Sequence, residues 1–83
     1  MALYLLSYDL RKQRDYQTLW AELKKFNAVR VLESDWCFER INTDAKGLRE
    51  HFKKFIDADD GLFIGEVADW ATYKARGTPN DLA

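Results

Sequence analysis

Asp9 is the residue whose type and position most directly suggest chemistry. It ends an apolar run that begins at Ala2, and it is followed by Arg11 and Arg14. A carboxylate can bind magnesium through its oxygens, and nearby cations can neutralise a phosphodiester. The competing interpretation is structural, because an aspartate after a strand commonly caps a turn and pairs with basic neighbours. By themselves, these residues favour the structural role.

The other reactive side chains have no evident partner in the sequence. His51 is the single histidine, without other ligands at metal-site spacing, and its use as a general base would need a partner that the sequence does not identify. Cys37 is the single cysteine, so it forms no internal disulfide, and it is expected to be a small buried apolar side chain. The acidic run at 57–60 does not match a calcium loop and predicts a solvated turn.

Aromatic side chains raise the question of a partner. Tyr8, Trp36 and Phe38 could stack on bases, as the sheets of RNA-recognition modules do, but the glycine-rich aromatic signature of those modules is absent. The same residues would serve as a dimer contact. Hydrophobic residues make up 47% of the chain and aromatic residues 14%, which is more apolar mass than two small helices are expected to hide. The sequence therefore favours a homodimer.

Charge is unevenly distributed along the chain. The net charge of −1 argues against a protein surrounded by nucleic-acid phosphate. Residues 1–30, however, contain six basic and three acidic side chains, a local charge of +3. A basic patch around Arg11, Lys12, Arg14 and Arg30 is thus compatible with an acidic whole, and these arginines are the candidate nucleic-acid contacts.

Four strands are expected from the apolar patterning. Residues 2–10 are apolar on both sides, which is typical of a central strand that is covered on both faces. Residues 28–33 and 35–42 form two further strand-like runs around a turn at Ser34, and 62–67 form the last.

Two helices lie between these strands. Tyr16, Leu19, Trp20, Leu23 and Phe26 form one apolar stripe, with Asp15 as N-cap, Asn27 at the end and Glu22 expected in solvent. A second stripe, capped by Asn42 or Thr43, contains Ala45, Leu48, Phe52, Phe55 and Ile56.

The order β-α-β-β-α-β predicts an α+β, ferredoxin-like sandwich, in which a four-stranded antiparallel sheet has two helices on one face. Residues 1–67 form this domain, and residues 68–83 form a helical turn and a loose tail. Asp69 and Gly77 would cap a helix at 69–76 that packs Trp70 and Tyr73 against the domain. A single domain is all that 83 residues allow. No membrane span or signal peptide is recognised, so a cytoplasmic protein is expected.

Three segments resemble the second CRISPR-associated protein family, here Cas-two. Residues 4–10 are similar to its opening strand, which closes on Tyr-Asp-Ile/Leu before basic residues. Residues 30–39 resemble its Arg-Val-Gln-x-Ser-Val-Phe-Glu stretch, and residues 56–64 its Ile-Asp…Asp-x-Leu-x-Ile run. The resemblance covers residues 1–67. It implies a ferredoxin-like homodimer in which an Asp pair across the dimer axis binds magnesium, and Asp9 is the matching position.

The resemblance leaves two main functions open. One is a magnesium-dependent endonuclease on RNA or DNA, in which Asp9 holds the metal while Arg11 and Arg14 hold phosphates; VapD-type ribonuclease toxins share a similar fold. The other is a non-enzymatic dimeric adaptor or regulator, with Asp9 in a structural role. A small-molecule sensor of the ACT type is also compatible with the fold. Family members usually exchange a fifth strand with the partner subunit, at the place where 69–76 here predict a helix.

Overall fold

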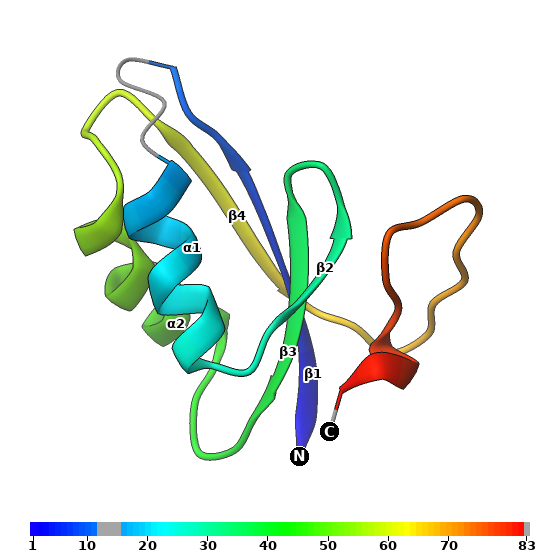
Figure 1. The fold of residues 1–83 in the computed structure, drawn as a ribbon. Coiled ribbons are helices and arrows are strands. Elements are labelled where there is room, and N and C mark those ends of the chain that lie inside the picture. The colour runs from blue at the N-terminus through cyan, green and yellow to red at the C-terminus, as the bar shows by residue number, and fades with distance from the viewer. Residues whose placement is uncertain (12–15, 83) are drawn as a thin grey trace.

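The computed structural model describes residues 1–11 and 16–82, and it confirms the predicted order of elements (Figure 1). The elements are β1 (Ala2–Asp9), α1 (Tyr16–Lys25), β2 (Val29–Leu32), β3 (Asp35–Arg40), α2 (Ala45–Phe52), the 3-10 turn η1 (Lys53–Phe55), β4 (Gly61–Glu66) and the 3-10 turn η2 (Pro79–Asp81). No described helix is both long enough and apolar enough to cross a lipid bilayer.

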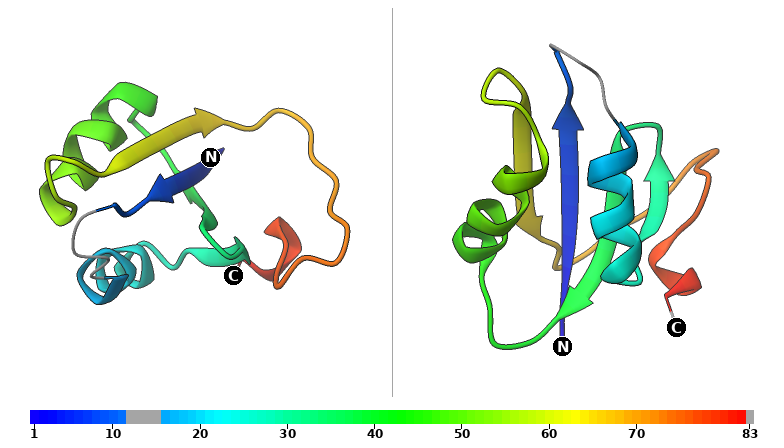
Figure 2. Two further views of the ribbon diagram at one scale, coloured as in Figure 1. Left: turned by 90° about the horizontal axis from the view of Figure 1, so that it is seen from above. Right: turned by 60° about the vertical axis from the view of Figure 1, so that its left-hand side comes forward.

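The sheet has the strand order β2-β3-β1-β4, and all its neighbouring strands are antiparallel. The predicted α+β, ferredoxin-like fold is therefore confirmed, with β1 and β3 in the centre. Both helices cover the same face, as the view from above shows (Figure 2). The end of β1 at Asp9 lies beside the start of β4, where Asp9 pairs with Gly61.

The helix-covered face holds the aromatic core, and this corrects the prediction for the sheet aromatics. Tyr8, Trp36 and Phe38 are all buried against the helices, so they are available neither for base stacking nor for a dimer contact. Phe63 is the only one of the strand aromatics in the described chain that remains exposed. Two short helices thus hide far more aromatic surface than expected. The buried cluster consists of Tyr4, Leu6, Tyr8, Leu10, Leu19, Leu23, Trp36, Phe38, Leu48 and Phe52.

The helix ends follow local chemistry, with one correction. Asn27 adopts a left-handed conformation (φ 55°) after α1, as predicted for a residue that ends a helix. The cap of α2 is Asp44, and neither Thr43 nor Asn42, since the Asp44 carboxylate accepts a hydrogen bond of 2.8 Å from the Gly47 amide. Asp15, the predicted cap of α1, lies outside the described residues.

The chain after β4 differs most from expectation. Residues 69–76 contain no helix, and the short C-terminal helix is instead η2, within the tail that was predicted to be loose. Residues 67–78, here called the crossing segment, run over the helix-free side of the sheet from β4 to β2 (Figure 2). The Val67 amide donates to the Leu3 carbonyl at 2.8 Å, and the Arg76 amide donates to the Val31 carbonyl at 2.8 Å. The same chain therefore covers part of its own second face.

The crossing segment arches over a cavity of about 410 Å³. Leu3, Leu5 and Cys37 form part of its floor on the helix-free side of the sheet, and Trp70 belongs to its roof. Tyr73, in contrast, is 82% exposed, so the prediction that it packs against the domain is wrong. Cys37 is buried as predicted, with 2% of its surface exposed.

Candidate functional site

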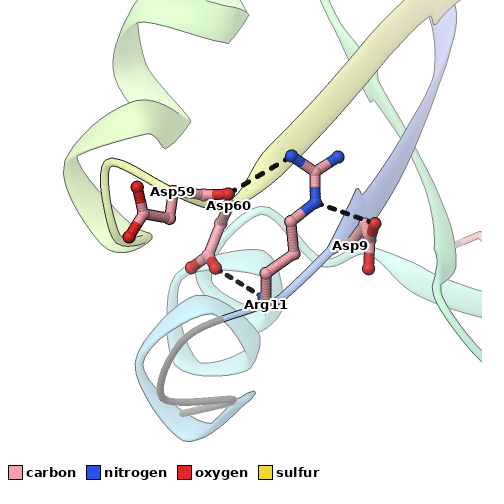
Figure 3. A network of polar contacts seen from close by, with 4 residues as sticks. All are labelled: Asp9, Arg11, Asp59 and Asp60. Atoms are coloured by element: carbon pink, nitrogen blue, oxygen red, sulfur yellow. Dashed lines mark hydrogen bonds and ion pairs between the residues drawn. The ribbon is translucent and has the colours of Figure 1, made fainter.

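Asp9 forms an ion pair with Arg11 at the end of β1. The Arg11 Nε donates to Asp9 Oδ2 at 3.0 Å, and 70% of the Asp9 side chain is exposed (Figure 3). Asp9 lies on the same side of β1 as Leu5 and Ser7, the helix-free side, because side chains alternate along a strand. The structure thus places the candidate carboxylate in reach of solvent and beside one of its predicted basic neighbours.

Arg11 is fixed from three directions. Besides its contact with Asp9, its amide donates to Asp60 Oδ1 at 2.7 Å, and its Nη1 donates to the Asp59 carbonyl at 3.3 Å (Figure 3). Gly61 makes this possible, since a Cβ there would lie only 2.8 Å from the Arg11 guanidinium. The acidic turn therefore positions Arg11, a role for 57–60 that the sequence did not reveal.

The electrostatic surroundings of Asp9 are more acidic than the sequence suggested. Figure 3 shows the Asp9 carboxylate at the Arg11 guanidinium, the Asp60 carboxylate at the Arg11 backbone amide, and the backbone carbonyl of Asp59 on the other side of the guanidinium. The turn also holds itself together, because the Asp57 amide donates to Asp60 Oδ2 at 2.9 Å. Lys12 and Arg14, two members of the predicted basic patch, lie outside the described residues.

Arg30 is not brought to Asp9. Its guanidinium lies 4.5 Å from the centre of the Trp20 ring in α1, on the helix-covered side of the sheet. Its Nε and Nη2 donate to the Glu33 carbonyl at 3.1 and 2.7 Å. Asp9 faces the other side, so Arg30 and Asp9 would contact one nucleic acid only if it wrapped around the edge of the domain.

A buried acid–histidine pair joins the two helices, and the sequence analysis missed it. His51 Nε2 lies 2.6 Å from Glu22 Oε2, and Glu22, expected in solvent, is buried. The ring of His51 also packs against Phe26, Phe52 and Phe55. A signal was present: Glu22 directly precedes Leu23 of the apolar stripe, at the edge of the buried face. Glu22 is almost fully covered while the His51 side chain is 35% exposed, and the contact links α1 to α2, which indicates a structural role.

The Glu22–His51 pair is expected to contribute measurably to stability. In a double-mutant cycle with Glu22→Gln and His51→Ala, we expect a coupling free energy of unfolding of about 0.5–2 kcal/mol, because without His51 the mostly buried Glu22 carboxylate keeps only the exposed Lys25, 3.8 Å away, as an ion-pair partner. Chemical denaturation of the four proteins measures it. The matched cycle is the half-exposed Arg49–Glu50 pair, 3.0 Å apart, where less than about 0.5 kcal/mol is expected. Equal coupling in both cycles would contradict the buried role.

The fit to magnesium depends on the number of chains. No group of three or more histidine, cysteine, aspartate or glutamate side chains within 1–11 and 16–82 could hold a metal ion. One chain offers the Asp9 carboxylate, of which Oδ2 already accepts from Arg11. Magnesium is commonly held by one or two carboxylates together with several waters. Two Asp9 residues across a dimer axis would supply the upper number of carboxylates, whereas one chain supplies a single carboxylate that also pairs with Arg11.

Neither a protein-family model nor a solved structure matches the chain.

Proposed function

We propose that the protein is a Cas-two-like homodimer that acts on RNA or DNA as a magnesium-dependent phosphodiesterase. The observation that carries this proposal is the position of Asp9: an exposed carboxylate at the end of a central strand, on the half of the helix-free face that the crossing segment leaves open. Phe63, 65% exposed, lines the same shallow surface as Asp9 and Ser7. We place the contact between two copies at this side chain, because aromatic residues are enriched in protein interfaces.

In the proposed phosphodiesterase, Asp9, Arg11 and Asp60 would have separate roles. Two Asp9 carboxylates would hold the ion, which when bound activates water and neutralises charge on the phosphate. Arg11 would exchange its contact with Asp9 for a substrate phosphate, because an exposed ion pair of this kind contributes only about 0–1 kcal/mol and is readily broken. The Asp60 contact to the Arg11 backbone would keep the side chain at the site during this exchange.

A dimeric adaptor without catalytic activity is the second candidate, and the fixed position of Arg11 favours it. An Asp9 that stays paired with Arg11 ties the end of β1 to the turn before β4 and needs no metal. The two functions differ in a direct assay of labelled RNA and DNA with magnesium or manganese, between about pH 6 and 9. Cleavage that a chelator abolishes supports the phosphodiesterase. Binding without cleavage supports the adaptor.

Phe63→Asp is expected to dissociate the dimer. Truncating an aromatic anchor and adding a charge next to Asp9 should raise the dimer dissociation constant by at least about tenfold. Sedimentation equilibrium across micromolar concentrations measures this. Ile41→Asp is the matched control, since Ile41 is 58% exposed but follows β3 at the opposite end of the sheet. A wild-type chain that stays a 9.8 kDa monomer would contradict the dimer.

A further inference from the structure

We propose that the cavity beneath the crossing segment binds a small molecule with an apolar body and one protonated amine. The cavity, about 410 Å³, lies within the range typical of small-molecule sites, about 300–1,000 Å³. It lies between two layers of the same chain, the sheet below and the crossing segment above. A ligand would therefore be enclosed on both sides, and would not lie on an open surface.

The floor of the cavity selects an apolar body. Leu3 and Leu5 of β1, Val31 of β2 and Cys37 of β3 line it from the helix-free side of the sheet. These side chains offer no strong hydrogen-bonding group, so their contribution comes from removing apolar surface from water. The Trp70 side chain adds an aromatic surface from the crossing segment.

The charge of the cavity selects a cation. Asp35 and Asp69 are its only charged lining residues in the described chain, and both are acidic. Asp69 Oδ1 accepts a hydrogen bond of 3.0 Å from the Trp70 amide, whereas the Asp35 carboxylate has no hydrogen bond or ion pair with residues 1–11 or 16–82. An ammonium group could pair with the Asp35 carboxylate, and an aromatic lining residue such as Trp70 also favours a cation. An anion would meet two carboxylates and no compensating charge.

This site is independent of the proposed nuclease. Asp9, Arg11 and Phe63 border the open half of the helix-free face and do not line the cavity. On β1 the cavity is lined by Leu3 and Leu5, nearer the start of the strand than Asp9, and it lies beneath the segment that begins with the Val67–Leu3 hydrogen bond. Loss of ligand binding would thus leave the test of Asp9 unaffected, and the reverse also holds.

Three probes with the same indole ring test the proposal: tryptamine, which is cationic, 3-ethylindole, which is neutral, and indole-3-propionate, which is anionic. Backbone amide shifts of the full chain, recorded by NMR during titration, give the affinities. We expect tryptamine to bind at least about tenfold tighter than indole-3-propionate, with shifts centred on residues 3–5, 35–37 and 69–72. Asp35→Asn should reduce this preference several-fold. Glu39→Gln is the matched control, because Glu39 lies on the same side of β3 but outside the cavity.

Cys37 gives a second readout, since it is the single cysteine and lies in the cavity floor. Tryptamine should slow the reaction of the Cys37 thiol with a small thiol reagent. The fractional loss of rate should equal about the fraction of cavities that tryptamine occupies. Equal affinity for all three probes, shifts elsewhere, or an unchanged preference in Asp35→Asn would overturn the proposal. Tight binding of the anion alone would overturn it as well.

Discussion

Asp9→Asn is expected to lower the rate of magnesium-dependent cleavage by at least about 100-fold while the fold persists. Loss of groups that only support a metal ligand already costs about 10- to 100-fold in metal affinity or activity, and Asp9 would be the ligand itself. Asparagine keeps the shape and one acceptor oxygen but removes the charge that binds the cation. The free energy of unfolding should change by no more than about 1 kcal/mol, because the Asp9–Arg11 pair is exposed.

Matched variants separate metal binding from general charge effects. Glu33→Gln removes an exposed carboxylate from the hairpin that neighbours Tyr8 at the same end of the sheet, and it should leave cleavage unchanged. Arg11→Gln should weaken substrate binding and reduce the slope of log affinity against log salt by about 1, while magnesium binding persists. Undiminished cleavage by Asp9→Asn would sink the phosphodiesterase. No cleavage by any protein, together with a silent Asp9→Asn, would leave the adaptor.

The sequence predicted the domain well wherever a local pattern determined the outcome. The alternation along residues 2–10 placed β1 in the centre, and the stripe from Leu19 to Leu23 placed α1 against the sheet. Asn27 ended α1 as its left-handed tendency suggests. These predictions depend on single residue types and on neighbours two to four residues apart, which a single sequence contains.

Contacts between distant segments were not predictable in this way. The Asp60–Arg11 and Glu22–His51 contacts join residues 49 and 29 positions apart, and nothing in their local spacing pairs them. The number of buried aromatic side chains was underestimated for the same reason. Tyr8 and Trp36 of the sheet form one buried cluster with Phe52 of α2 only when the helices pack on the sheet. Gly77 was taken as a helix end because glycine often ends helices. In the structure its φ is not positive, and its small size is what matters.

Gly77→Ala is expected to detach the crossing segment and expose Cys37. A Cβ at position 77 would lie 2.7 Å from Val29 Cγ1 and 2.8 Å from the Arg30 carbonyl oxygen. The Arg30 carbonyl belongs to β2 and cannot move aside. The clash should therefore weaken the docking of the crossing segment on the sheet by about 1–3 kcal/mol. Because a buried thiol reacts only when the segment opens, the rate of Cys37 labelling should rise by roughly 10- to 100-fold.

The pH profile of labelling distinguishes release of the segment from general destabilisation. Burial raises the pKa of the Cys37 thiol, and the negative charge of Asp81, in η2, raises it further. Release of the segment removes the burial, which is the larger cause, so the thiol pKa of Gly77→Ala should fall toward its ordinary value and labelling should level off at lower pH. Gly47→Ala is the matched control, since its Cβ would meet only the side-chain oxygens of Thr43 and Asp44, at 3.2 Å. If Gly77→Ala is labelled at the wild-type rate, the crossing segment does not shield Cys37. That result would also contradict the proposal that this segment covers the ligand cavity.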